Sequence, residues 1–242
     1  MTSDPDGATV DDHDLDGFDP YDAFDAEAVR VRAFLEGLDD VGWSAPTRCA
    51  LWDRRALAAH LDATEDYHRA CLDDTLGVLM QRYLDAGVTG MDDANRFGVQ
   101  ERAGLPAAEV VATWAARNAD TRRRLRERDG ELMSTMAGPY PVRWQAFHIA
   151  DELATHADDL GVPVPDDEVA ARRVWRAAFA RFALHESHPD VAPQVVAGGT
   201  GVTVGGQVVV VDDASLIDVV MGREPTGGPV DADVRSALAL MA

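Results

Sequence analysis

The sequence has 242 residues, of which 46% are hydrophobic and 27% are charged, a composition typical of a globular protein. Its net charge of −21 disfavours partners that present a phosphate backbone or an anionic membrane surface. The N-terminal residues are acidic, and no apolar run is long enough to cross a bilayer. We therefore expect no signal peptide, no membrane helix and no nucleic-acid partner, and we expect a cytoplasmic protein.

The two cysteines, Cys49 and Cys71, form no CxxC pattern. This spacing argues against a disulfide framework and against a thiolate-rich metal site. A metal ion in this protein is therefore expected to be bound by nitrogen and oxygen.

The first elements of the chain differ sharply in composition. Residues 1–19 are rich in Asp and poor in apolar side chains, which predicts a disordered acidic tail because too little surface can be buried. From residue 20 apolar residues recur at helical spacing, which predicts a helix over residues 20–38. An ordered loop with two tryptophans follows, and Asp53 is the expected N-cap of a helix over residues 53–74.

The middle of the chain carries weaker and stronger helix signals in turn. Residues 75–104 are weakly helical, and the polar residues 90–96 within them are expected to form a surface connection. A clearer helix is predicted over residues 105–129, where a proline occupies the first turn and a basic run closes the last. A last long helix is predicted to start after residues 138–141 and to end at Gly161.

Beyond this helix the pattern changes to short mixed elements. The sequence predicts a helix over 166–186, strands over 201–204 and 207–211 joined by a two-glycine turn, and short helices over 214–221 and from Ala232. The fold class is therefore α+β and mainly helical. We expect a four-helix bundle over residues 20–161 and a small C-terminal α+β domain over residues 162–242.

Three side chains in the last long helix suggest a metal site. His148, Glu152 and His156 are each four residues apart, so they share one helix face at about 6 Å per step. One ion can reach only a neighbouring pair, and Glu152 with His156 would recruit a further ligand from another helix. His60, inside the apolar stripe of the second helix, is the natural donor. Such a set suits a divalent ion, with zinc first and nickel, iron or manganese as alternatives, and leaves a coordination position open.

Other interpretations of the same residues stay open. A lone histidine such as His60 on an apolar stripe also fits a hydrogen-bonded core residue. Asp159, three residues after His156, can accept the free ring N–H of a ligating histidine, or it can be a solvated residue at the helix end. Glu65 and His68 form one E-x-x-H pair, the element that di-iron bundles use twice. Nucleophile-elbow and nucleotide-binding glycine motifs are absent from the sequence.

Three stretches carry a family resemblance: WSAPTRCALWDRRALAAHL, then GPYP, then DELATHADDLG. They resemble the mycothiol-dependent maleylpyruvate isomerase family, which is part of the wider DinB-like superfamily of metal-dependent proteins. The resemblance covers residues 24–161. It implies a four-helix bundle that holds one divalent metal through a histidine on the second helix and a Glu and a His on a later helix. Those positions fall on His60, Glu152 and His156.

The resemblance also implies a chemistry. A low-molecular-weight thiol, mycothiol or a similar one, would occupy the open metal position, lose its proton and act as a nucleophile. The expected enzyme is an S-transferase or an isomerase that acts on a small electrophile. The stretch LIDVVMGRE resembles a family segment that ends in Gly-Arg, so the resemblance assigns to Arg223 the anchoring of a substrate carboxylate. A surface arginine near a helix end is the competing interpretation, and His148 has no ligand counterpart in the family.

A second function class stays open beside the enzyme. The same bundle and metal fit a non-catalytic metal-binding or regulatory protein without thiol turnover. The expected partners are a small-molecule electrophile and a thiol, and the expected assembly is a monomer or a homodimer.

Overall fold

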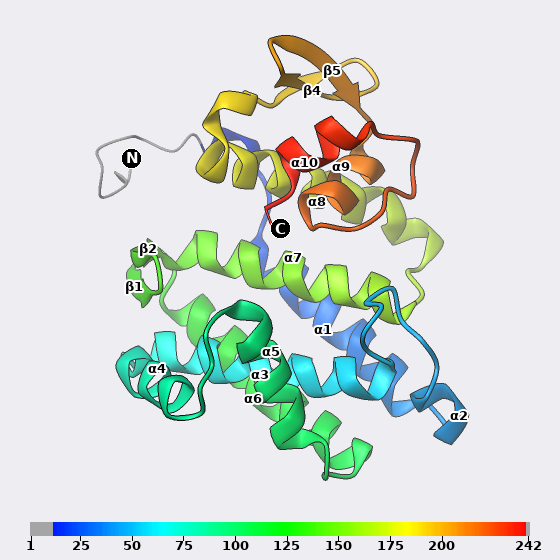
Figure 1. The fold of residues 1–242 in the computed structure, drawn as a ribbon. Coiled ribbons are helices and arrows are strands. Elements are labelled where there is room, and N and C mark those ends of the chain that lie inside the picture. Colours follow the sequence, from blue (N-terminus) through cyan, green and yellow to red (C-terminus); the bar gives the residue numbers. More distant parts are fainter. Residues whose placement is uncertain (1–11, 241–242) are drawn as a thin grey trace. The chain divides into compact units, whose positions relative to one another are not determined.

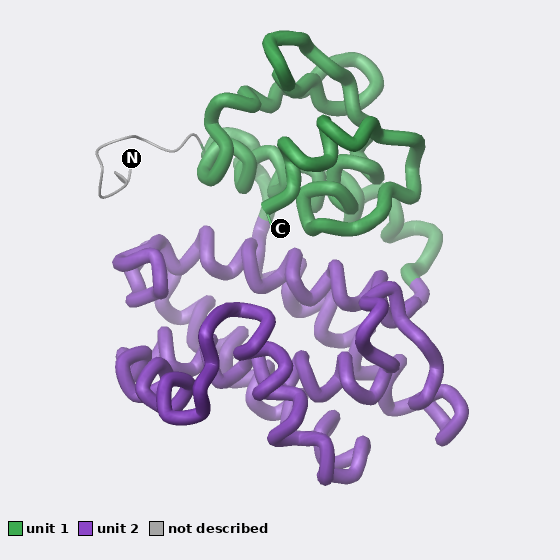
Figure 2. Tube along the Cα trace, viewed as in Figure 1, with its two compact units in different colours: residues 1–18, 164–242 green, residues 19–163 purple. Residues whose placement is uncertain are grey.

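The computed structural model of the protein describes residues 12–240, and the chain divides into two compact units (Figure 2). Residues 19–163 make up the bundle unit. Residues 1–18 and 164–242 make up the C-terminal unit. The division lies close to the predicted domain boundary after residue 161.

Four long helices dominate the bundle unit (Figure 1). They are α1 (Pro20–Glu36), α3 (Arg54–Leu72), α6 (Ala107–Glu127) and α7 (Val142–Leu160). Helix α1 packs against α6 and α7, and α3 packs against the same two helices, which confirms the predicted four-helix bundle. The core between them is apolar and includes Phe24, Leu35, Leu57, Trp114, Leu125 and Phe147.

The ends of these helices follow local sequence signals. The Asp53 carboxylate accepts a hydrogen bond from the backbone N–H of Ala56, which confirms Asp53 as the N-cap of α3. Helix α7 ends at Gly161, whose φ of 76° lies in the left-handed region that glycine adopts without steric cost. These two signals fix where α3 and α7 begin and end, and both helices carry predicted metal ligands.

Shorter elements complete the bundle unit, and some of them correct the sequence-based expectation. They are α2 (Asp40–Trp43), α4 (Leu76–Asp85), α5 (Met91–Arg102), β1 (Leu132–Thr135) and β2 (Gly138–Pro141). The expected surface connection over residues 90–96 is wrong, because α5 begins at Met91. The Arg102 side chain of α5 is buried against Asp62 of α3, a tertiary contact that local polarity does not reveal. The antiparallel hairpin of β1 and β2 is an unpredicted element.

The C-terminal unit combines helices with one small sheet. Its elements are η1 (His13–Leu15), α8 (Asp166–Ser187), η2 (Pro189–Val191), β3 (Gln194–Val196), β4 (Gly199–Val204), β5 (Gln207–Val211), α9 (Asp213–Val220) and α10 (Ala232–Leu238). The sheet is antiparallel in the order β3-β4-β5. Gly205 and Gly206 have φ angles of 58° and 79° and join β4 to β5, which confirms the predicted hairpin.

The predicted acidic tail falls partly on described residues. Residues 1–11 of it lie outside the described residues. The 3-10 helix η1 lies within the segment for which the sequence predicts disorder, so that prediction is wrong for residues 13–15. The reason is tertiary: Leu15 is buried, and Arg181 of α8 donates a hydrogen bond to the Asp14 carboxylate at 2.6 Å.

Among the described helices, none combines the length and the apolar character needed to cross a membrane.

Candidate metal centre

Three predicted ligands from two helices meet inside the bundle unit. His60 comes from α3, and Glu152 and His156 come from successive turns of α7. The Nε2 atoms of His60 and His156 lie 3.1 Å apart, and Glu152 Oε1 lies 3.9 Å from His60 Nε2. One ligand atom from each of the three residues falls within 4.8 Å of the others. The structure therefore brings together the residues that spacing and resemblance selected.

A hydrogen bond to a buried carboxylate orients one of these rings. His156 Nδ1 lies 3.1 Å from Asp159 Oδ2, and the side chain of Asp159 is fully buried. A ring N–H at Nδ1 that donates to this carboxylate leaves the Nε2 lone pair available to a metal. The predicted contact between Asp159 and His156 is thereby confirmed.

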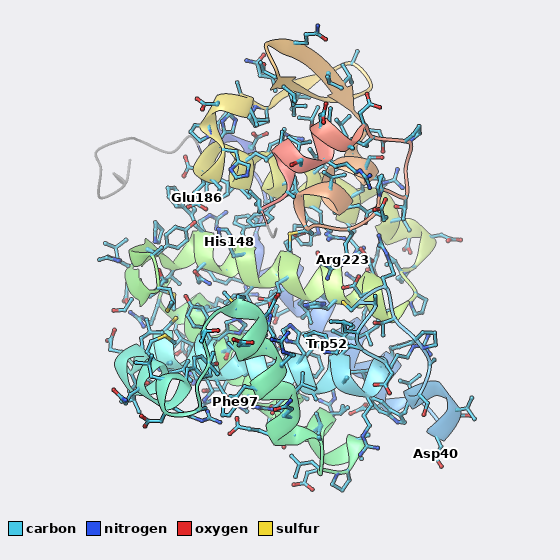
Figure 3. All side chains as sticks on the ribbon, in the orientation of Figure 1. Asp40, Trp52, Phe97, His148, Glu186 and Arg223 are labelled. Carbon is cyan, nitrogen blue, oxygen red and sulfur yellow. The ribbon has the colours of Figure 1, made fainter. Side chains whose placement is uncertain are left out.

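The surroundings of the three residues are largely protein. The side chains of His60 and His156 are 5% and 10% exposed, whereas that of Glu152 is 33% exposed. The ring of Trp52, labelled in Figure 3, lies 4.7 Å from the His60 ring between centroids. Of the three side chains, that of Glu152 is the most exposed to solvent.

The residues present fit a divalent metal ion. Two imidazole nitrogens and one carboxylate oxygen are the donor set of many catalytic zinc sites, in which the fourth position stays open. Tetrahedral bonds of about 2.0–2.1 Å place two nitrogen ligands roughly 3.3 Å apart. The observed Nε2 to Nε2 distance of 3.1 Å is close to this value. The same distance also fits a hydrogen bond between the two rings. The two nitrogens would therefore need to move little to bind an ion.

A comparison with known protein families identifies the family of this chain. The family model described as the mycothiol maleylpyruvate isomerase N-terminal domain matches residues 24–161, more than half of the chain. The chain belongs to this family. The family domain includes His60, Glu152 and His156 and falls within the bundle unit. No curated protein and no solved structure matches the chain.

A cysteine that the sequence did not single out lies beside the group in the family domain. Cys49 Sγ lies 3.1 Å from Asp159 Oδ2, the same oxygen that faces His156 Nδ1. Cys49, His156 and Asp159 form a second set whose ligand atoms lie within 4.8 Å of one another. Because Nδ1 and Nε2 lie on different edges of the imidazole ring, this set is on the other side of His156 from His60. The position of Cys49 in an irregular loop gives no periodic signal that could have revealed it.

The predicted E-x-x-H pair lies next to Glu152. His68 Nε2 lies 3.8 Å from Glu152 Oε2, and His68 Nδ1 lies 3.8 Å from Glu65 Oε1. Burial alone would raise the pKa of Glu65, but hydrogen bonding and charge from His68, with hydrogen bonds from Thr121 and Asn118, lower it below its usual value. Burial opposes protonation of His68, but Glu65 and then Glu152 outweigh burial and raise the pKa of His68.

These neighbours do not form a second ion site. Within residues 12–240, the sets of side chains close enough to share an ion contain neither Glu65 nor His68. The di-iron interpretation therefore has no structural support, and the E-x-x-H pair needs another explanation.

The two remaining predicted residues, His148 and Arg223, are not members of the three-residue group. The Nε2 atom of His148 lies 3.0 Å from the hydroxyl of Tyr140 in β2 (both on the family domain, with His148 labelled in Figure 3). Arg223 follows α9 in the C-terminal unit, where its Nη1 donates to the carbonyl oxygen of Met221 at 3.0 Å. The anchoring role of Arg223 stays a prediction.

Proposed function

We propose that the protein is a metal-dependent enzyme that uses mycothiol or a similar low-molecular-weight thiol to attack a small electrophile. The observation that carries this proposal is the buried group of His60, Glu152 and His156, which lies inside the family's N-terminal domain. The name of the family supports thiol-dependent chemistry. The proposed reaction is transfer of the thiol to the electrophile or cis–trans isomerisation of it.

Each of the three residues has a distinct part in holding the ion. His60 and His156 supply neutral imidazole nitrogens, and Glu152 supplies the one negative charge. We propose zinc as the native ion, with nickel, iron or manganese as alternatives. When bound, a divalent ion lowers the pKa of a coordinated thiol so that the thiolate forms at neutral pH.

The chain's own side chains prepare this site. Asp159 keeps the proton of His156 on Nδ1, so Nε2 stays a ligand through the reaction. The Trp52 ring packs against His60 and restricts its rotation. The exposed edge at Glu152 is the side from which thiol and electrophile would enter.

Two reactions begin from the same thiolate. In isomerisation, the sulfur adds to an activated double bond, rotation follows about the resulting single bond, and elimination of the thiolate restores the double bond in the other geometry. In S-transfer, the sulfur displaces a leaving group, which departs with the bonding electron pair. Arg223 would pair its planar guanidinium with a carboxylate of the substrate.

The remaining parts of the proposal concern partners and location. We propose a cytoplasmic protein that binds only small molecules and acts as a monomer or a homodimer. The net charge of −21 supports the exclusion of nucleic acid and of anionic membranes.

The test measures metal and thiol binding on the full chain. Protein purified without chelator should hold about one divalent ion per chain, since His60, Glu152 and His156 together supply the three ligands of one ion. After replacement by Co²⁺, a low-molecular-weight thiol should produce a sulfur-to-cobalt charge-transfer band and shift the visible spectrum. If the Co²⁺ spectrum does not change with any thiol tested, the result would favour the non-catalytic metal-binding alternative. Protein that holds no metal even after incubation with zinc would overturn the proposal.

A further inference from the structure

Glu152, on α7, lies between two histidines of another helix, α3. His60 Nε2 lies 3.9 Å from Oε1, and His68 Nε2 lies 3.8 Å from Oε2. Positions 60 and 68 are eight residues apart on α3, so their side chains share one face of that helix. One oxygen of the carboxylate therefore faces the candidate metal group, and the other faces a buried imidazole outside it.

Glu152 is the ligand that most needs support. Its side chain is 33% exposed, whereas the two ligating histidines are 5% and 10% exposed. A glutamate has three rotatable side-chain bonds, and a partly exposed one samples several rotamers unless a neighbour fixes it. A contact that restrains Oε2 would therefore also hold Oε1 in the orientation that binds the metal.

His68 is well placed to provide that restraint because it is itself buried beside a second carboxylate. Its side chain is 5% exposed, and its Nδ1 lies 3.8 Å from Oε1 of Glu65, which is 1% exposed. The Glu65 carboxylate accepts hydrogen bonds from Asn118 Nδ2 at 2.9 Å and from Thr121 Oγ1 at 2.6 Å, both on α6. A continuous row of buried polar groups thus runs from α6 through α3 to the ligand on α7.

We propose that His68, backed by Glu65, is a positioning residue that holds Glu152 in the orientation that binds metal. This inference rests on the metal centre of the proposed function. It gives the E-x-x-H pair a role outside the ligand set. Side chains that orient metal ligands commonly change metal affinity by about 10- to 100-fold when they are removed.

The experiment compares variants at position 68 by zinc affinity and by cobalt spectrum. Zinc affinity of metal-free full-length protein is measured by competition with a chromophoric chelator. His68→Leu should weaken zinc binding by about 10- to 100-fold and change the Co²⁺ spectrum, because the carboxylate no longer binds in one fixed orientation. His68→Gln should recover most of the affinity, because its amide nitrogen reaches the place of the imidazole Nε2.

Two further variants separate positioning from general stability. In a Glu152→Ala background, His68→Leu should cause no additional loss of zinc affinity, since His68 acts through Glu152. His148→Leu is the matched control: it removes a histidine from α7, one turn before Glu152, whose partner is Tyr140. It should leave zinc affinity unchanged. Unfolding of the metal-free proteins in urea measures the structural cost of each change separately.

The outcomes distinguish this inference from the proposed function. Equal zinc affinity in the natural protein and in His68→Leu would overturn the positioning role alone, as would losses that add fully in the double variant. Natural protein that binds no zinc would overturn the proposed metal centre itself. If His68→Leu does not fold, Glu65→Gln takes its place, because its amide can still bond to Asn118 and Thr121 while the charge behind His68 is removed. A several-fold loss of zinc affinity then supports the role, and unchanged affinity overturns it.

Discussion

The two compact units bury different kinds of side chain. Among the described residues, the buried histidines His60, His68 and His156 all lie in the bundle unit. The core cluster of the C-terminal unit is aliphatic and consists of Ala180, Leu184, Val191, Val202, Val211, Leu216, Val219, Val220, Val234 and Leu238. Burial of polar groups costs free energy unless partners compensate, whereas burial of aliphatic groups stabilises directly.

The difference indicates where the chemistry lies. The bundle unit keeps a row of buried titratable side chains, of which Glu65, His68 and His156 have neighbours of opposite charge or hydrogen-bond partners. Such a row is retained at the expense of stability where it serves binding or catalysis. The C-terminal unit also buries charged side chains, namely Arg176, Arg181 and Asp218, but none of its described histidines is buried, and its hydrophobic core cluster is aliphatic. We therefore expect substitutions of the metal-site histidines in the bundle unit to lower metal affinity, and substitutions in the aliphatic cluster of the C-terminal unit to lower the free energy of unfolding.

The largest expected effect is on metal binding in the bundle unit. His156→Ala removes a proposed ligand and should lower zinc affinity by more than the 10- to 100-fold typical of residues that only orient ligands. Elemental analysis should then find almost no metal in the variant. His148→Ala is the control and should keep its metal, because His148 pairs with Tyr140 outside the ligand group. Equal losses in both variants would contradict the ligand assignment.

The next effect is on the stability of the C-terminal unit. Leu216 is fully buried in the aliphatic cluster, so Leu216→Ala should lower the free energy of unfolding by about 2–5 kcal/mol. Val208→Ala, at a side chain that is 72% exposed on β5, should change it by less than about 0.5 kcal/mol. Urea unfolding followed by circular dichroism measures both. A similar cost at the two positions would show that the aliphatic cluster does not support this unit.

A smaller effect, with a pH signature, is expected at an ion-pair network in the bundle unit. Asp66 pairs with Arg102 and Arg117. Burial opposes ionisation of Asp66, but the two arginines outweigh it and lower the pKa of this carboxyl below its usual value. Asp66→Asn should lower the free energy of unfolding by about 1–3 kcal/mol at pH 7.

The sign of the pH dependence follows from the direction of the shift. A carboxyl whose pKa is lower in the folded state stabilises the protein above its unfolded pKa, about 3.9 for Asp. That stabilisation is lost as the pH falls through the lower folded pKa. The gap between natural protein and Asp66→Asn should therefore be constant from pH 7 to about 5 and close below pH 4. A gap that widened on acidification would contradict the assignment. Asp85→Asn, at an exposed residue of α4, is the control and should change the free energy of unfolding at pH 7 by less than about 0.5 kcal/mol.

A pair of glycine substitutions, one of similar size and one smaller, tests the packing of α5 on α3. A methyl group added at Gly98 would lie 2.6 Å from the Cβ of Ala63, so Gly98→Ala should force the two helices apart and cost about 1–3 kcal/mol. At Gly77, in α4, an added Cβ meets nothing within 4 Å. Gly77→Ala should instead stabilise the protein by about 0.4–1 kcal/mol. Thermal unfolding of the two variants should show shifts of opposite sign.

The outcome for α5 and for η1 shows why some elements escaped prediction. Residues 90–96 are polar, yet α5 forms because Arg102 and Gly98 contact α3. Residues 13–15 are acidic, yet η1 forms because Leu15 is buried and Asp14 pairs with Arg181. In each case the stabilising partner lies far away in sequence, so a local window contains no signal of it.

The residues of the site also divide into those that the sequence predicted and those that it did not. The spacing of Glu152 and His156 places both on one face of a helix, and this follows from helix geometry alone. Asp159 follows from the same geometry, and His60 was proposed from its place in the apolar stripe of the second helix and then from the family motif. The approach of Cys49 to Asp159 and of His68 to Glu152 could not be predicted, because each joins a loop or a second helix to α7.

The sequence by itself determined the four long helices, the N-cap of α3 at Asp53 and the end of α7 at Gly161. It also determined the hairpin at Gly205 and Gly206 and the helix face that carries Glu152 and His156. Those features depend on backbone geometry and hydrogen bonds between residues close in the chain. Only the tertiary structure decided that His60 Nε2 lies 3.1 Å from His156 Nε2 and that Glu152 lies between two histidines of α3. Such contacts depend on how side chains of α3 and α7 pack, and that packing is a property of the whole bundle core.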